Sequence, residues 1–416
     1  MSDVLEGGPG GAGPTRRGWL VAGLAALVAA GAYAAVRANH PGNAGESRPS
    51  ISGAAPATSP PSPSLSPSPW PSGAGACGST AYRPLMSRQP LTARTGVRVL
   101  VGGYGVRLVD ADTGTARPIR GIPADARRMI SPLVSAAGAV YARSAQCDGS
   151  AAMVYRLANG TARPVAAGNV ADLLAGTTRV WVVSDPDAPT RPVVLRLLGS
   201  DRSLTLPPDA YPIADTTAGL VVAADQGDPG SKPPAVTVLD PATGRPVRTL
   251  GAGRPLAADR VQVLLLSGRC DQGQALPSCT VARVDVRSGQ VRDRYPLPGG
   301  RVPASAGVVS RDGRLVAFQL ARVYADPRFD PGHPLPPSDL AVLHLDTGQL
   351  NTVPGLEFAP KTAAGLVFGA DSYWLFATVS DGDHAHLLAW HPGLDAPQSV
   401  ARLPGPVAWA PPLLIT

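Results

Sequence analysis

The chain has 416 residues, of which 44% are hydrophobic and only 5% aromatic, and its 47 Gly and 46 Pro favour many short strands over long helices. The formal net charge is +7, but the basic residues are almost all Arg and are scattered along the chain. Because no basic stripe is available to follow a phosphate backbone, the sequence predicts no nucleic-acid binding.

The first predicted element is an uncharged run over residues 18–36, preceded by Arg16 and Arg17. As a helix it would span about 28 Å, close to the hydrocarbon thickness of a bilayer. It predicts a single transmembrane helix, with residues 1–17 in the cytoplasm and the rest of the chain extracytoplasmic. Two alternatives stay open. Ala32-Tyr33-Ala34 fits a signal-peptide cleavage site, which would release the protein near Ala34. Thr15 to Leu20 resembles a twin-arginine export signal, and Arg16 and Arg17 equally fit an ordinary positive flank.

Residues 37–76 are rich in Pro and Ser and contain little that could be buried. Such a segment predicts a disordered, extended linker, either as a stalk that lifts a domain from the membrane or as a tail with no spacing role. The folded domain is then expected over residues 77–416.

Four cysteines follow the linker, an even number that suits an exported protein with disulfides. Cys270 and Cys279 flank a polar loop between two apolar runs, which predicts a disulfide across a hairpin. Cys77 and Cys147 would form the second pair by elimination. A metal site is the alternative, although no C-x-x-C spacing occurs.

From residue 97 onward one pattern recurs: two apolar runs, a tight turn rich in Asp, Gly and Thr, and a short strand. Successive turns are separated by 46, 40, 44, 45, 59 and 47 residues, with markers at Gly114, Gly160, Ser200, Gly244, Gly289, Gly348 and Asp395. A period of 40 to 50 residues with about four strands is typical of a propeller blade. The sequence therefore predicts an all-β fold, a seven-bladed β-propeller.

Two irregularities fit this count. The long interval contains an insertion, Tyr324 to Asp339, in the sixth unit. The first unit lacks an opening strand, whereas the last is followed by the apolar run 407–416. That run is expected to supply the innermost strand of the first blade and close the ring; a loose tail is the alternative.

Short turn motifs carry a resemblance to known families. The D-x-x-T-G turns at Asp110 to Gly114 and Asp240 to Gly244 resemble those of exported YVTN-type and quinoprotein-like propellers, and Ser310 to Phe318 resembles a TolB-type repeat segment. The chain thus looks like an exported bacterial β-propeller, membrane-anchored and of actinobacterial type. The motifs imply a fold and little about activity.

No nucleophile elbow, P-loop or H-E-x-x-H motif is present, and no cofactor is expected. The best metal candidate is a group in the seventh unit, Asp383, His384 and His386, in which the two imidazoles would face the same side of a strand. The alternative is an ordinary solvated turn.

The loops between the second and third strands of each unit are long and variable, which favours binding there. The candidate binding residues are Asp148, Asp185, Asp187, Asp225, Asp228, Tyr324, Asp326, Arg328, Asp330, His333, Asp381 and Asp383. We expect a monomeric binding or sensing module without catalysis, whose partner is an envelope protein or a cell-wall ligand. The alternative is an exported enzyme acting on a glycan or small substrate in the channel, including a quinoprotein-like dehydrogenase.

Overall fold

The structure is a computed structural model, which describes residues 91, 93–123, 125, 127–147, 151–184, 192–207, 209–224, 233–270, 278–322, 338–358, 364–380, 384–405 and 411–415. The predicted transmembrane segment, the linker and Cys77 lie outside these residues. Within them, no helix is long and apolar enough to cross a membrane.

The described chain forms seven antiparallel sheets, which we call blades 1 to 7, and each is given from its inner to its outer strand. Blades 1 to 3 are β29 (Leu413–Ile415), β1 (Arg98–Val101), β2 (Arg107–Asp110), β3 (Ala116–Pro118); β4 (Arg128–Ala136), β5 (Ala139–Gln146), β6 (Ala152–Ala158), β7 (Thr161–Gly168); and β8 (Asp172–Ala175), β9 (Val180–Val183), β10 (Val194–Leu197), β11 (Ser203–Thr205). Blades 4 and 5 are β12 (Ala210–Asp215), β13 (Leu220–Ala224), β14 (Ala235–Leu239), β15 (Pro246–Ala252); and β16 (Arg254–Ala258), β17 (Gln262–Arg269), β18 (Ser278–Asp285), β19 (Val291–Pro296). Blades 6 and 7 are β20 (Arg301–Pro303), β22 (Leu315–Arg322), β23 (Ser338–His344), β24 (Leu350–Phe358), with β21 (Val308–Val309) also paired to β22; and β25 (Gly365–Phe368), β26 (Leu375–Ser380), β27 (His384–Trp390), β28 (Gln398–Pro404).

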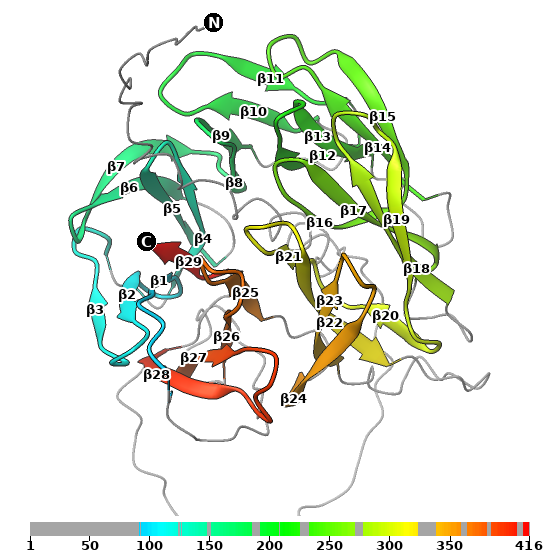
Figure 1. Cartoon of the computed structure of the whole chain (residues 1–416). Helices are drawn as coiled ribbons and strands as arrows, with labels where there is room; N and C mark the ends of the chain where they lie inside the picture. The colour runs from blue at the N-terminus through cyan, green and yellow to red at the C-terminus, as the bar shows by residue number, and fades with distance from the viewer. Residues whose placement is uncertain are drawn as a thin grey trace, which may run out of the picture.

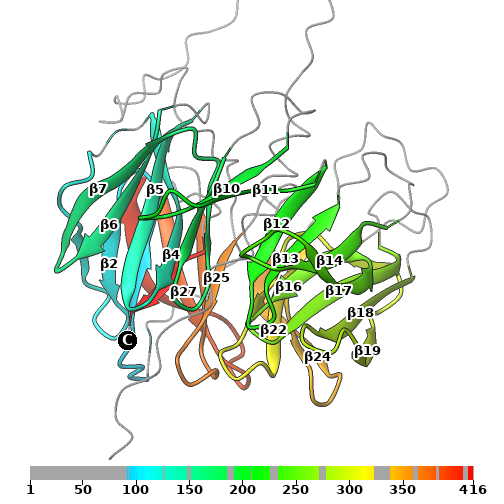
Figure 2. The same cartoon turned by 90° about the horizontal axis from the view of Figure 1, so that it is seen from above.

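The ring closes through the last strand of the chain. β29 pairs antiparallel with β1, with Leu414 opposite Val99, and becomes the innermost strand of blade 1. Each inner strand also lies against the next, in the order β29, β4, β8, β12, β16, β21, β25 and back to β29. Figure 1 shows the sheets around a common centre with the C-terminal strand inside, and Figure 2 shows the first and last blades side by side. The predicted all-β, seven-bladed propeller is therefore confirmed.

The repeated turns form because Asp side chains cap their own backbone. In the turn after β14, Asp240 Oδ1 accepts hydrogen bonds from the amides of Ala242 and Thr243, at 2.6 and 3.0 Å. Gly244 then takes a φ of 71°, which only glycine adopts without strain. Asp110 with Gly114 and Asp285 with Gly289 repeat the arrangement. All seven sequence markers lie between the third and fourth strands of a blade.

The core lies between the blades because successive side chains of a strand point alternately toward the blade before and the blade after it. In β27, Leu387 packs with Val99 and Val101 of blade 1, while Leu388 packs with Leu340 and Val342 of blade 6. Seven such boundaries leave the two ends of the ring as the surfaces on which loops and turns are displayed.

Candidate functional site

The two ends of the propeller carry different connections. In blade 2, Arg128 at the start of the inner strand pairs with Gln146 at the end of β5, and its Nη1 lies 3.2 Å from the carbonyl oxygen of Ala151, just before β6. The inner strands therefore begin on the side of the long loops between the second and third strands. We call this side the loop face, and the opposite side, with the remaining hairpin turns, the turn face.

Charged residues of the inner strands gather at the loop face. The inner strands contain five charged residues, and four of them, Arg128, Asp172, Arg254 and Arg301, are the first residue of β4, β8, β16 and β20. We call these four the mouth. The fifth, Asp215, ends β12 on the turn face. Between the two ends the inner strands are almost wholly apolar, so their charge is concentrated at the loop-face end.

On the blade 2 and 3 side of the mouth, Asp172 lies near Arg143 of β5. The Nε of Arg143 donates to the carbonyl oxygen of Val170 at 2.6 Å, and its Nη1 donates to Ser131 at 3.3 Å, so the guanidinium is held at the boundary. Asp172 keeps some exposed surface, but protein atoms closely surround its carboxyl group. Burial therefore raises its pKa to about 6, although the charge of Arg143 and a hydrogen bond from the amide of Leu173 oppose the rise.

On the blade 5 and 6 side, two guanidinium groups belong to neighbouring blades. Arg254 is exposed, and its Nη2 donates across the boundary to the carbonyl oxygen of Pro303 at 3.1 Å. Two residues before Pro303, Arg301 Nη1 lies 2.6 Å from Asp339 Oδ2 of β23. Arg254 and Arg301 are thus the first residues of inner strands in neighbouring blades, and Arg254 contacts the backbone of the strand that begins with Arg301.

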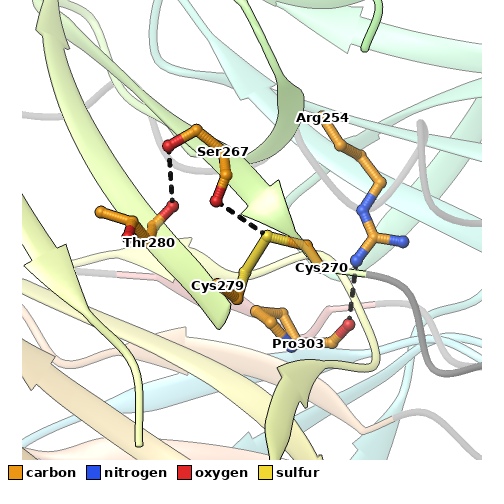
Figure 3. The surroundings of a disulfide bond; sticks show 6 residues. All are labelled: Arg254, Ser267, Cys270, Cys279, Thr280 and Pro303. Carbon is orange, nitrogen blue, oxygen red and sulfur yellow. Dashed lines mark hydrogen bonds between the residues drawn. A yellow bond between two sulfur atoms is a disulfide. The ribbon is translucent and has the colours of Figure 1, made fainter. Parts of the chain in front are cut away.

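The predicted disulfide between Cys270 and Cys279 is confirmed and lies beside Arg254 (Figure 3). Both cysteines are buried in the cluster shared by blades 4, 5 and 6. The carbonyl oxygen of Ser267 lies 3.2 Å from Cys270 Sγ, a close contact in which the oxidised sulfur has no proton to donate. The bond closes the base of the loop between β17 and β18, next to Arg254.

Neighbouring blades on the turn face are joined by their first hairpin turns. Blade 2 donates from Ala137 N to Thr177 O of blade 3, and Thr217 N of blade 4 donates to Arg260 O of blade 5, at 3.2 and 2.9 Å. Farther round, Gln262 Nε2 donates to Gly313 O at 3.0 Å, and Asp312 N donates to Ser372 Oγ at 3.2 Å. An ion pair between Arg179 and Asp215 joins blades 3 and 4. From blade 2 to blade 7, the polar groups of these turns are therefore hydrogen-bonded or ion-paired to those of the neighbouring blade.

The candidate binding residues predicted from the loops fall outside the described part of the chain. They are Asp148, Asp185, Asp187, Asp225, Asp228, Tyr324, Asp326, Arg328, Asp330, His333, Asp381 and Asp383. The described residues on either side of these loops lie on the loop face. The role of the candidate residues in binding remains a prediction.

His384 and His386 are the first and third residues of β27, so their side chains lie on the same side of the strand. Arg402 Nη2 lies 3.0 Å from His384 Nδ1. Asp383 lies outside the described residues, within which no three His, Cys, Asp or Glu side chains are grouped as metal ligands would be. His391 lies at the other end of the strand, with its ring stacked 4.4 Å from that of Tyr373.

Cys147 is also disulfide-bonded, as predicted for an oxidised domain. Cys77, the partner expected for it, lies outside the described residues. Because Cys147 follows β5 directly, this second bond is on the loop face.

The four charged residues of the mouth were not predicted from the sequence. The prediction followed loop lengths and acidic residues, whereas Arg128, Asp172, Arg254 and Arg301 are single charged residues at the start of apolar strands. A signal was present, because a charged residue in that position recurs in four of the seven units. Recognising it requires knowing which strand of each blade is innermost.

Fold and mouth together define the class of protein: a closed seven-bladed β-propeller with charged residues at the loop-face end of its inner strands. No protein-family model matches the chain, and no curated protein sequence matches it.

Solved structures do resemble it. TolB from Acinetobacter baumannii is 12% identical with a TM-score of 0.41, over 76% of this chain and 66% of that one. A Lactobacillus plantarum protein is 13% identical with a TM-score of 0.48, over 77% and 99%. A puromycin-hydrolysing peptidase from Mycobacterium tuberculosis is 16% identical with a TM-score of 0.46, over 79% and 57%. At these values the likenesses bear on no more than the fold, which the sheets and their closure establish by themselves.

Proposed function

We propose that the chain is a membrane-tethered, extracytoplasmic propeller that binds an envelope protein or a cell-wall ligand through its loop face, without catalysis. The observation that carries the proposal is the unequal use of the two ends. Four of the five charged residues of the inner strands lie at the loop face, whereas the first hairpin turns of the turn face are hydrogen-bonded or ion-paired to one another. Binding groups on a rigid scaffold are expected where polar side chains and variable loops coincide.

The test is capture of a partner from envelope extracts by the full-length chain in detergent. In one form the insertion between Tyr324 and Asp339 is replaced by a short turn. In the matched control, the exposed turn-face residues Arg245 and Arg287 are both replaced by Ala. A partner lost with the insertion, but retained by the control at an unchanged thermal midpoint, is the expected result. A partner retained by the shortened form, or lost equally from both, contradicts the proposal.

One observation favours the enzyme alternative. Asp172, with a pKa raised to about 6, begins the inner strand β8 on the loop face beside Arg143, and a carboxyl group with a pKa near neutrality suits acid–base chemistry. If this alternative holds, small glycans should raise the thermal midpoint of the full chain and be converted by it. Asp172→Asn should then abolish turnover and leave the captured partner unaffected.

A further inference from the structure

The turn between β25 and β26 exposes an aromatic ring on the turn face of blade 7. Among the described residues, five large hydrophobic side chains are exposed, and Tyr373, at 47%, is the only aromatic one. The other four are valines. Single exposed valines are ordinary on a protein surface, whereas an aromatic ring offers a large flat contact area to a ligand. Tyr373 is therefore the exposed apolar side chain of the described chain that is best suited to bind one.

The turn itself does not require this ring. Asp371 Oδ1 accepts a hydrogen bond from the amide of Tyr373 at 3.0 Å. In the corresponding turn of blade 5, between β16 and β17, Asp259 Oδ1 accepts one from the amide of Val261 at 2.7 Å. Val261, which is 52% exposed, thus takes the position of Tyr373 in the same capped turn. A valine is sufficient there for the fold, so local structure gives no reason for a tyrosine.

The ring of Tyr373 is nevertheless held in one orientation by the next turn of blade 7. It stacks on the ring of His391, with the centroids 4.4 Å apart and the planes inclined by 27°. Its hydroxyl group donates to the carbonyl oxygen of Pro392 at 3.4 Å. Trp374 packs edge-on against the opposite side of the stack, 4.5 Å from His391. One face of the Tyr373 ring is covered, its exposed area lies on the rest, and little conformational entropy remains to be lost on binding.

Polar groups around the ring are hydrogen-bond acceptors. His391 Nδ1 lies 2.7 Å from the carbonyl oxygen of Pro392, which can only accept, so Nδ1 carries the proton and Nε2 of the neutral ring is an acceptor. Within the described chain no group donates to this Nε2. Asp371 and Asp395 are exposed in the same two turns, which contain no Arg or Lys. These surroundings favour a neutral ligand that carries hydroxyl donors and disfavour an anion.

We propose that Tyr373 and His391 form a carbohydrate-binding site on the turn face, in which a neutral pyranose stacks on the open face of Tyr373. The C–H bonds on one face of a pyranose complement the negative face of an aromatic ring. Its hydroxyl groups lie around the edge of the sugar, where they can donate to His391 Nε2 and to the two carboxylates. A flat apolar surface with a few fixed polar groups is the composition expected of a ligand site. The site is separate from the loop face and gives the turn face a binding role of its own.

The experiment is calorimetric titration of the full-length chain with cellotetraose and, separately, with chitotetraose, in a detergent whose headgroup contains no sugar. Wild type is expected to bind at least one of the two saturably. Tyr373→Ala should weaken binding roughly tenfold or more, the loss expected for one aromatic contact. Tyr373→Phe keeps the ring and should stay within about threefold of wild type. Val261→Ala is the matched control, since Val261 occupies the corresponding turn of blade 5, and should change the affinity less than about twofold.

Tyr373→Val separates binding from folding. It reproduces the turn of blade 5, so it should fold with a thermal midpoint close to that of Val261→Ala and still lose the sugar. This variant keeps the test decisive if Tyr373→Ala does not fold.

Absence of saturable binding of both tetrasaccharides overturns the site, as does wild-type affinity in Tyr373→Val. A Tyr373→Phe variant that binds as weakly as Tyr373→Ala also overturns it, because stacking would then not be the source of affinity. Binding that is lost in Asp172→Asn but retained in Tyr373→Ala would locate the sugar at the mouth and overturn the turn-face site. Capture of a partner through the loop face should be the same for wild type and Tyr373→Ala, so failure of this site is distinguishable from failure of the proposed function.

Discussion

Arg179 of blade 3 and Asp215 of blade 4 form a bidentate ion pair across the boundary between the two blades. Nε of Arg179 lies 2.5 Å from Oδ2 of Asp215, and Nη2 lies 2.7 Å from Oδ1. The indole N–H of Trp181 donates to the same carboxylate at 3.0 Å. The Asp215 side chain is only 2% exposed, and a Cβ added at Gly176 would meet its Oδ2 at 2.4 Å. Asp215 is thus a buried charge whose neighbours are arranged around it.

Replacing Asp215 by Ala should lower the free energy of unfolding by about 1–3 kcal/mol, because the buried indole N–H of Trp181 loses its acceptor and the partly exposed Arg179 loses its ion-pair partner. Thermal unfolding of the full chain measures the change as a fall in the midpoint of several degrees. Asp201→Ala is the matched control, since Asp201 is exposed in the last turn of blade 3. An Asp215→Ala midpoint equal to that of the control would show that the pair is not stabilising.

Removal of residues 411–416 should break the ring. Blade 1 would lose its inner strand β29, and β1 would present an unpaired edge, with Val99 no longer covered by Leu414. We expect a lower thermal midpoint and concentration-dependent aggregation, measured by light scattering. Removal of Thr416 alone leaves the β29 pairing intact and is the control. A truncated chain that stays monomeric and unfolds at the wild-type temperature would contradict closure by this strand.

Much of the fold could be predicted because the turn chemistry is local. The hydrogen bonds from the amides of Ala242 and Thr243 to the Asp240 side chain, and the positive φ of Gly244, depend on five consecutive residues, so the repeat is visible without tertiary information. The pairing of β29 with β1 joins residues more than 300 apart in the sequence. It was predictable only because one unit lacked a strand and an apolar run was left at the other end.

The candidate site was less predictable because it is assembled across blades. Arg254 and Arg301 are one blade apart, and neither has a motif around it. Asp339 was noted in the sequence as the end of an insertion, whereas in the structure it is the second residue of β23 and pairs with Arg301. Such convergence follows from register between strands, which loop length and composition do not specify.

The Cys270–Cys279 bond should stabilise the domain by about 3 kcal/mol, the chain-entropy estimate for closing a short loop. The double variant Cys270→Ser and Cys279→Ser should therefore unfold at a lower temperature than wild type. Because both cysteines are buried, mild reductant should open the bond only when the protein unfolds. Rapid reduction of this pair in the folded chain, followed by thiol labelling and mass spectrometry, would contradict the prediction.

Asp172 should make stability depend on pH between about 4 and 6. Its pKa is raised from 3.8 to about 6, mainly by burial, so the folded state holds the proton more tightly than the unfolded state does. The stabilisation from the protonated form is complete below about pH 4 and is lost as the pH rises through 6. Above that pH the ionised carboxylate costs at most about 3 kcal/mol, the equivalent of a shift of roughly two pKa units.

Asp172→Asn should therefore match the wild-type thermal midpoint near pH 4 and exceed it at pH 7.5. The control is Asp209→Asn, an exposed position on the loop side of the next blade, which should follow wild type at both pH values. An Asp172→Asn variant less stable than wild type at pH 7.5 would mean that attraction to Arg143 outweighs burial, and the sign of the pKa shift would then be wrong.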